Sequence, residues 1–340
     1  MVIVKKEVKL CPCCMEEHEV CVVTVDEYSN FKGKDVEFSA TYAYCSLADE
    51  YYEEGDMSSL NDIAMKNAYR KTCDLLTTEG IVSIRNKYDI TQTDLALLLG
   101  WGAKTITRYE THQVQDIAHD TILRKIDSDP EWFLSLLRNA REKFAPLTYV
   151  KYHRKAMQLF ENAQDAYLRK SIFAQYARFD DNPAVCGYTK LNLDKVVDVV
   201  RYFSNAQNVI NLYKVKLMKL LWYADALSFK VRGRSMMGLV YKALPMGAVP
   251  VAHESIIHLL GIRCMEEEFS QSTAYHFLPT ESKEYPMLTN EDIDILERVA
   301  ASLGSLSKDA LIDYMHEEDA YVCTELYSII PYKYAETLSI

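Results

Sequence analysis

The sequence lacks any apolar run close to the roughly 18 residues that a membrane-crossing helix needs. Its first ten residues, MVIVKKEVKL, also lack the apolar core and small-residue cleavage site of a secretory signal. We therefore expect a soluble, cytoplasmic protein. Positive charge is scarce as well, because 38 Lys and Arg stand against 49 Asp and Glu, a net charge of −11. Any binding of nucleic acid must then come from a local face and weaken steeply with salt.

Familiar catalytic motifs are missing too. The chain has no phosphate-binding loop, no dinucleotide-binding glycine pattern, no nucleophile elbow and no HExxH motif. His316 is followed by three acidic residues, 317–319, but neighbours along a helix do not converge on one point. The sequence therefore predicts a protein that is not an enzyme. The competing hypothesis, a hydrolase that uses His316 or a cysteine, requires strongly perturbed titratable groups in a cleft.

The chain of 340 residues is long enough for two or three domains. Alternating β-branched and aromatic residues in 20–25 and 36–42 predict short strands, whereas helical patterns dominate from residue 58 onward. We expect a mainly α protein with a small β-rich, zinc-ribbon-like hairpin domain at its N-terminus. The expected parts are a zinc-ribbon-like domain (1–57), a helix-turn-helix domain (58–146), a helical linker (147–184) and a mostly helical domain (185–340).

The nine cysteines are unevenly placed, and four of them lie within residues 11–21. Cys11 and Cys14 form a C-x-x-C knuckle, the unit that a zinc ribbon uses twice. A second knuckle begins at Cys45, but Ala48 stands where its second cysteine belongs. Cys11, Cys14 and Cys45 are the candidate ligands of a structural zinc ion; the alternative is a degenerate ribbon in which hydrophobic packing has replaced the ion. The fourth ligand is left open among four neighbouring side chains, namely Cys13, His18, Cys21 and Asp49.

Residues 91–110 have the pattern of a helix-turn-helix. With Gln92 as the first position, the expected inward residues are Leu95, Ala96, Leu99, Ile106 and Tyr109. Ala96 stands where the two helices touch most closely, and Gly100 stands in the turn, where a positive φ is needed.

Five polar residues of this motif are expected to face outward and contact DNA: Gln92, Lys104, Thr105, Thr107 and Arg108. The N-terminal half of the second helix would enter the major groove, where Lys104 and Arg108 can reach guanine acceptors or phosphates. Gln92, at the start of the first helix, is placed to hold a phosphate.

The stretch 106–110 (ITRYE) resembles the recognition helix of Xre/Cro-type repressors. A ribbon-like hairpin followed by this helix-turn-helix resembles the MqsA-like antitoxin family over about residues 9–140. The resemblance implies a zinc-stabilised N-terminal domain, often in contact with a toxin, and a dimeric DNA-binding domain that represses its own operon.

A second resemblance begins with YTKLNLDKV at 188–196 and continues with KLMKLLWYAD at 216–225. Gly238, the segment GAVP at 247–250 and LIDYMHE at 311–317 follow in order. Together these segments resemble the Panacea (SocA-like) antitoxin domain over about residues 186–335. The resemblance implies that the domain neutralises a toxin by binding it directly.

Apolar residues in 213–228 recur at helical spacing and predict a core-facing stripe. The opposite face is expected to be basic and exposed, either as an ordinary solvated face or as a docking patch for an acidic toxin or an extra contact to DNA. The residues concerned are Lys214, Lys216, Lys219, Arg232 and Arg234.

The sequence as a whole predicts a homodimeric antitoxin that binds a cognate toxin through its C-terminal domain and its operator DNA through the helix-turn-helix. The alternative is a transcriptional repressor that senses a small ligand and has no toxin partner. That alternative requires an apolar pocket in the C-terminal domain.

Overall fold

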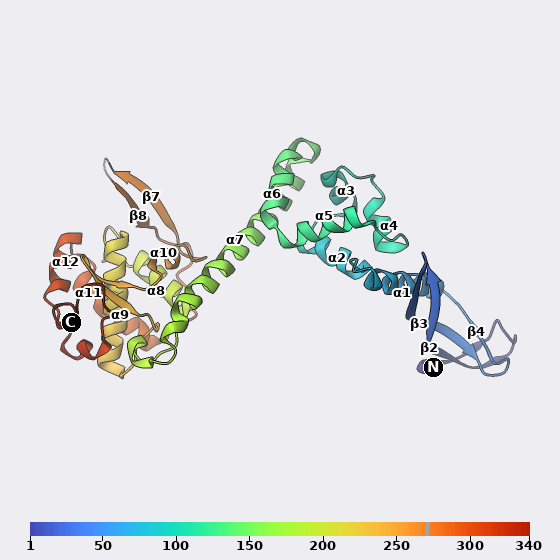
Figure 1. Ribbon diagram of the computed structural model, residues 1–340, viewed down its shortest axis with the longest axis horizontal. Coiled ribbons are helices and arrows are strands. Elements are labelled where there is room, and N and C mark those ends of the chain that lie inside the picture. Colours follow the sequence, from blue (N-terminus) through green and yellow to red (C-terminus); the bar gives the residue numbers. More distant parts are fainter. Residues whose placement is uncertain (270–271) are drawn as a thin grey trace. The chain divides into compact units, whose positions relative to one another are not determined.

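The computed structural model describes residues 1–269 and 272–340, which form two compact units, Met1–Phe160 and Glu161–Ile340. The helices and strands of each unit are labelled along the chain in Figure 1. The predicted fold class is confirmed, because a small antiparallel sheet is followed by predominantly helical segments. The four-part division of the chain at residues 57, 146 and 184 remains a prediction.

The N-terminal sheet contains four antiparallel strands in sequential order, namely β1 (Val2–Leu10), β2 (Glu17–Phe31), β3 (Lys34–Cys45) and β4 (Glu50–Tyr52). Lys32 and Gly33 turn the chain between β2 and β3, with φ of 51° and 76°. Two consecutive positive φ values are typical of the tight hairpin turn that matches strand twist. The long β2–β3 hairpin is thus closed by residues suited to it.

Helix α1 (Met57–Thr72) packs against β3 and links the sheet to the helices that follow. The side chain of Asn61 accepts a hydrogen bond from the Thr41 N–H (2.8 Å) and donates one to the Thr41 carbonyl (3.0 Å). At the other end of α1, the buried Arg70 donates to the carbonyls of Tyr109 and Gln113, both at 2.9 Å. These bonds fix the sheet and the helical bundle to opposite ends of one helix.

The helical bundle consists of α2 (Thr78–Lys87), α3 (Gln92–Leu99), α4 (Thr105–Thr111), α5 (Ile117–Ser128) and α6 (Pro130–Asn139). The ring of Tyr88 stacks on Phe133, with centroids 3.8 Å apart, at the centre of its core. Helix α7 (Pro146–Tyr176) contributes Tyr152 and Ala156 to this core, and its last residues, including Ile172, belong to the core of the second unit.

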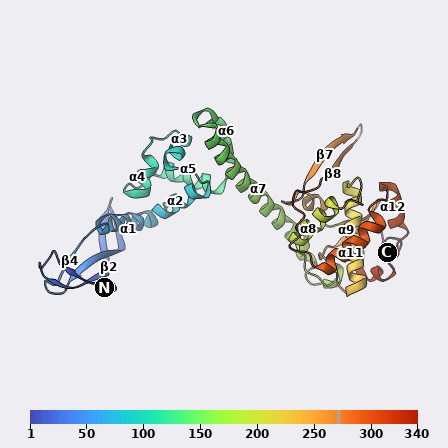
Figure 2. The same ribbon diagram turned by 180° about the vertical axis from the view of Figure 1, so that it is seen from behind.

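The second unit is built around α9 (Lys214–Arg232). Helix α9 is contacted by α8 (Leu193–Asn205), α11 (Asn290–Leu303) and α12 (Lys308–His316), which lie beside it in both Figure 1 and Figure 2. The remaining elements are β5 (Tyr241–Leu244), β6 (Gly247–Pro250), α10 (His253–Ile256), β7 (Cys264–Phe269), β8 (Ser272–Phe277) and α13 (Asp319–Val322), with short 3-10 turns at Arg141–Lys143, Ala177–Phe179, Pro183–Cys186 and Tyr332–Thr337.

Every residue of α9 from Lys216 to Ser228 is buried, so the expected exposed basic face is wrong for this part of the helix. The ammonium of Lys216 instead donates to the carbonyls of Ile210 (2.6 Å) and Gly304 (2.8 Å). Asp225, on the same helix, accepts hydrogen bonds from the Met237 N–H and the Tyr241 hydroxyl, and burial raises its pKa to about 6. The helix is therefore a central core element rather than an amphipathic surface helix.

Lys219 carries the least compensated of these buried charges. It is 1% exposed, and within the described residues it makes no hydrogen bond or ion pair. Burial lowers the pKa of Lys219 to about 8 from the usual 10.5. Because an unfolded chain binds this proton more readily, the charge destabilises the fold fully below pH 8 and progressively less as pH rises towards 10.5.

Replacing Lys219 with methionine is expected to raise the free energy of unfolding of the second unit by about 3 kcal/mol at pH 7, since each pKa unit corresponds to about 1.4 kcal/mol. Denaturant titrations at pH 7 and pH 10 measure the effect, which should shrink at the higher pH. The control is Lys216→Met, which should not stabilise because it leaves two carbonyls without a donor. Equal stabilisation of both variants would contradict the assignment.

Within the described ranges, no helix combines the length and the apolar character needed to cross a bilayer.

Candidate DNA-reading helix and metal centre

Four potential metal ligands gather at one end of the N-terminal sheet. Cys11 and Cys14 lie in the turn between β1 and β2, His18 lies on β2, and Cys45 ends β3. One ligand atom from each residue lies within 4.8 Å of all the others. Three thiolates and one imidazole are a common donor set for a four-coordinate structural zinc ion.

The structure identifies His18 as the fourth member of this cluster. Its Nδ1 lies 2.9 Å from the carbonyl oxygen of Glu19, which can only accept a hydrogen bond, so Nδ1 carries the proton. Nε2 therefore faces the cluster, 3.5 Å from the Sγ of Cys45, where it can bind a metal ion when the ring is neutral or donate a hydrogen bond to a thiolate when the ring is protonated. This arrangement, with the second ring nitrogen held by a carbonyl, is typical of metal-binding histidines.

Other open candidates for the fourth ligand have different partners. The thiol of Cys13 donates to Glu50 at 3.3 Å, and this hydrogen bond raises the pKa of Cys13 to about 12. Asp49 accepts a hydrogen bond from the Tyr44 hydroxyl at 2.7 Å. Ala48, which replaces the missing cysteine, donates its backbone N–H to the Sγ of Cys45 at 3.4 Å.

The electrostatics of Cys11 suit a thiolate. Burial by itself raises the pKa of a thiol, but hydrogen bonds from the backbone amides of Cys14 and Cys13 and from His18 outweigh it and lower the pKa of Cys11 to about 6. A thiolate is the form that binds metal. The cluster therefore fits a zinc ion in its donor set, and Cys11 favours the thiolate form, whereas burial raises the pKa of the Cys14 thiol.

The helix-turn-helix adopts the predicted geometry. Leu95, Ala96, Ile106 and Tyr109 are buried, and Gly100 ends α3 with φ of 70°. Leu99 is partly exposed, and the adjacent Leu98 is buried instead. The small side chain of Ala96 and the left-handed glycine allow the two helices to meet closely.

A buried carboxylate, which the sequence analysis missed, ties this motif together. Glu110 is 9% exposed and pairs with Arg85 of α2, with Nε and Oε1 2.8 Å apart. The amide of Gln92 donates to the same carboxylate at 2.6 Å, and the Thr107 hydroxyl donates to Gln92 Oε1 at 2.8 Å. Side-chain groups of Gln92 that were expected to hold a phosphate are thus engaged within the motif.

Two cations are presented by α4. Lys104 and Arg108 are exposed, and among the described residues neither side chain has an ion-pair or hydrogen-bond partner. They are four residues apart and hence share one helix face. Thr105 is half-buried beside them. Because the chain as a whole is acidic, any binding of nucleic acid needs a local positive face, and Lys104 and Arg108 provide one.

The five residues predicted as a toxin-docking patch do not form one surface. Lys216 and Lys219 are buried, and Arg232 pairs with the buried Asp292 at 2.8 Å. Lys214 pairs with Glu254, and Arg234 is exposed. The prediction of a continuous basic patch is therefore wrong, because two of the five residues are buried, two are paired with carboxylates, and Arg234 lies beyond the end of α9.

His316 is not part of a catalytic cluster in the described structure. Its ring stacks on Tyr321, with centroids 4.3 Å apart, and its buried Nε2 has no hydrogen-bond partner there. The neighbouring Glu318 accepts hydrogen bonds from Ser339 and Tyr223 instead.

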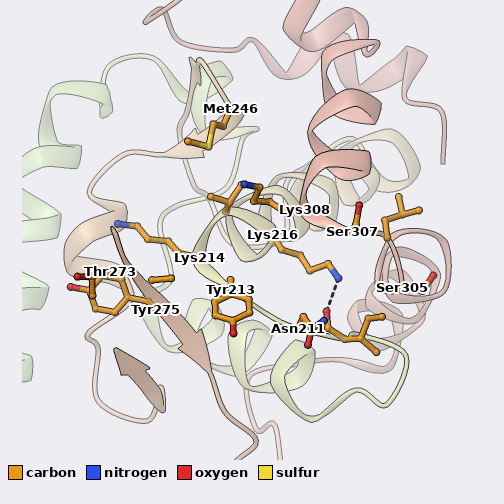
Figure 3. Close-up of a pocket in the computed structure, with 14 residues that line it drawn as sticks. Asn211, Tyr213, Lys214, Lys216, Met246, Thr273, Tyr275, Ser305, Ser307 and Lys308 are labelled. Atoms are coloured by element: carbon orange, nitrogen blue, oxygen red, sulfur yellow. Dashed lines mark hydrogen bonds between the residues drawn. The ribbon is translucent and has the colours of Figure 1, made fainter. Parts of the chain in front are cut away.

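A cavity of about 680 Å³ lies in the second unit, at the start of α9 and α12 (Figure 3). Lys214, Lys216 and Lys308 line it together with apolar and hydroxyl side chains. No local pattern in the sequence predicts this cavity, because its walls come from four segments spread over about a hundred residues.

Comparison with protein families finds two matches. Residues 9–138 match the model described as the antitoxin component of bacterial toxin-antitoxin system, MqsA. Residues 217–321 match the model described as antitoxin SocA-like, Panacea domain. No curated protein and no solved structure matches the chain. Both resemblances inferred from the sequence are confirmed, although the second match is shorter than the expected 186–335.

Proposed function

We propose that this chain is the cytoplasmic antitoxin of a toxin-antitoxin pair, which binds its toxin through the C-terminal domain and represses its own operon through the helix-turn-helix. Both stretches matched by family models belong to antitoxin families. The proposed action is stoichiometric binding, without catalysis by this chain. A structural zinc ion held by Cys11, Cys14, His18 and Cys45 belongs to the same proposal.

One observation carries the proposal: the chain combines two stretches that match antitoxin families with two exposed cations at α4, Lys104 and Arg108, that have no partner among the described residues. In the proposed complex, the N-terminal half of α4 enters the major groove, with Lys104 and Arg108 on bases or phosphates. A homodimer would place two such helices on half-sites about one helical turn apart. Gln92 would hold α4 in place through its hydrogen bonds with Thr107 and Glu110, rather than contact the DNA itself.

The decisive experiment is co-expression of the full chain with the product of the adjacent gene, scored by bacterial growth. The proposal expects that the neighbour alone stops growth and that the full chain restores it through a stable complex. A neighbour that is harmless when expressed alone would refute the toxin part of the proposal.

Replacing Arg108 with alanine should weaken specific binding to the chain's own promoter by about 1–3 kcal/mol, because a good base contact is lost. Fluorescence anisotropy with promoter and scrambled DNA at fixed salt measures both affinity and discrimination. The matched control is Arg138→Ala, an exposed arginine at the end of α6. If Arg108→Ala and the control bind alike, α4 does not read the DNA.

A second candidate function is a repressor that senses a small ligand, and the cavity of about 680 Å³ favours it. That volume lies within the usual range for small-molecule sites. This candidate expects a ligand that raises the melting temperature and changes promoter affinity, in a chain whose neighbouring gene is not toxic.

A further inference from the structure

The cavity of the second unit has three walls of different character. Residues 214–216 begin α9, and residues 307–308 begin α12. Residues 273–275 of β8 form the third wall. Figure 3 shows the side chains of Lys214, Lys216 and Lys308 from the two helices, with Thr273 and Tyr275 from the strand; the ammonium groups of Lys214 and Lys216 point to different sides.

The helical walls are electropositive. Lys216 is 3% exposed, and its ammonium is held by two backbone carbonyls rather than by a carboxylate. Lys214 and Lys308 do have acidic neighbours, Glu254 and Asp309, but these carboxylates are 66% and 83% exposed, so water screens them. The N-termini of two helices add partial positive charge to the same place. A negatively charged group is the complement of these walls.

The third wall is an edge of β8 that is paired at one end only, where Tyr213 forms an antiparallel bridge with His276. The N–H of Phe277 donates to the Leu212 carbonyl, and that of Leu278 donates to the Arg263 carbonyl beside β7, both at 2.9 Å. Because backbone groups alternate along a strand, the N–H groups of Thr273 and Tyr275 point away from β7, to the same side as that of Phe277. The part of this edge before the Tyr213–His276 bridge can accept a further strand.

Apolar side chains surround the charged part of the cavity. Ile210 and Met246, both about half exposed, stand at its rim, and Val215 and Leu306 also line it. A small inorganic anion would contact the lysines but leave this apolar rim and the strand edge unused. An extended peptide that carries an acidic side chain would engage all three features.

We propose that this cavity binds an extended, acidic segment of the toxin, which adds a strand beside Thr273–Tyr275 and places a carboxylate between the starts of α9 and α12. The inference rests on the proposed function, since it names the part of the partner that the C-terminal domain holds. Backbone pairing with β8 supplies general affinity, and the lysines select segments with Asp or Glu.

Two variants of the full-length chain test the two kinds of contact. Lys308→Glu reverses a charge at the first turn of α12, a position where an acidic residue suits the helix. Thr273→Pro removes an N–H that points away from β7, so the β7–β8 pairing is kept. The charge control is Lys283→Glu, an exposed lysine outside the cavity.

The measurement is the Kd for the purified product of the adjacent gene, together with binding of overlapping synthetic peptides that tile its sequence. We expect one acidic peptide to bind the wild-type chain and compete with the whole protein. Lys308→Glu should weaken binding of both by about tenfold or more, whereas Lys283→Glu should change it less than about twofold. Thr273→Pro should also weaken both, with promoter binding unchanged.

The inference is overturned if the wild-type chain binds the gene product and both cavity variants bind it equally well. It is also overturned if no peptide binds and the variants alter only the response to a small anion. These results differ from failure of the proposed function, in which the wild-type chain itself neither binds the gene product nor protects cells from it.

Discussion

Removing the proposed zinc ion from the purified protein is expected to unfold the sheet β1–β4 while residues 161–340 stay folded. The sheet has little else to hold this end together, because the core around the cluster contains only four fully buried residues in the described structure: Cys11, Val20, Ala43 and Cys45. Apparent free energies of structural zinc binding are on the order of 10–16 kcal/mol, far more than such a core provides. The metal and the fold of this sheet should therefore be lost together.

Metal analysis and amide NMR spectra before and after chelation measure this effect. The wild-type chain should contain about one zinc ion, and chelation should collapse the dispersed signals of residues 2–52. Cys11→Ser and His18→Ala should reproduce the metal-free spectrum. The matched control is Cys13→Ser, in the same turn but bonded to Glu50, which should keep the metal. A metal-free chain with an intact sheet would contradict the assignment of this cluster.

Replacing Glu110 with alanine should destabilise the N-terminal unit by about 3–5 kcal/mol, the usual cost of removing one partner of a buried ion pair. The change leaves the Arg85 guanidinium without its carboxylate and frees the amide of Gln92. Since Gln92 in turn holds Thr107, α4 should lose its fixed orientation, and promoter binding should fall with stability. Denaturant unfolding and anisotropy give the two readouts.

Two controls separate the buried pair from ordinary surface charge. Asp127→Ala breaks the exposed pair with Lys87 and should cost less than about 1 kcal/mol. The double variant Arg85→Met, Glu110→Leu should recover most of the stability, because apolar residues of similar volume can replace a buried pair. Recovery of stability without recovery of DNA binding would assign the pair a positioning role for α4. A small effect of Glu110→Ala alone would show that the pair is not needed.

The features predicted correctly were those that short stretches of sequence contain. The helix-turn-helix was recognisable because Ala96, Gly100 and Ile106 satisfy steric requirements within one local motif. The knuckle of Cys11 and Cys14 is similarly local. The identity of the fourth member of the cluster was not, because it depends on how β2 leaves the turn and which ring nitrogen of His18 faces inward.

The errors arose where distant segments cover a residue. From their spacing, the lysines of α9 look like one exposed face of the helix. Periodicity alone does not show that the carbonyls of Ile210 and Gly304 accept hydrogen bonds from the buried Lys216 ammonium. Arg85 and Glu110 are 25 positions apart on different helices, so no spacing rule links them. The cavity walls likewise meet only after β8 and α12 have packed around α9.

The burial of lysines within α9 has a consequence for synthesis of the chain on the ribosome. Helices α11 and α12, which contact α9, follow it by some 60 to 80 residues, and the turn at Tyr332–Thr337 follows later still. At about 5–20 residues per second, the emerging segment waits several seconds without its cover. During that interval Lys216 and Lys219 interrupt a run that would otherwise favour aggregation, as charged gatekeeper residues do. The charge of Lys219, which weakens the finished fold, thus helps to protect the nascent one.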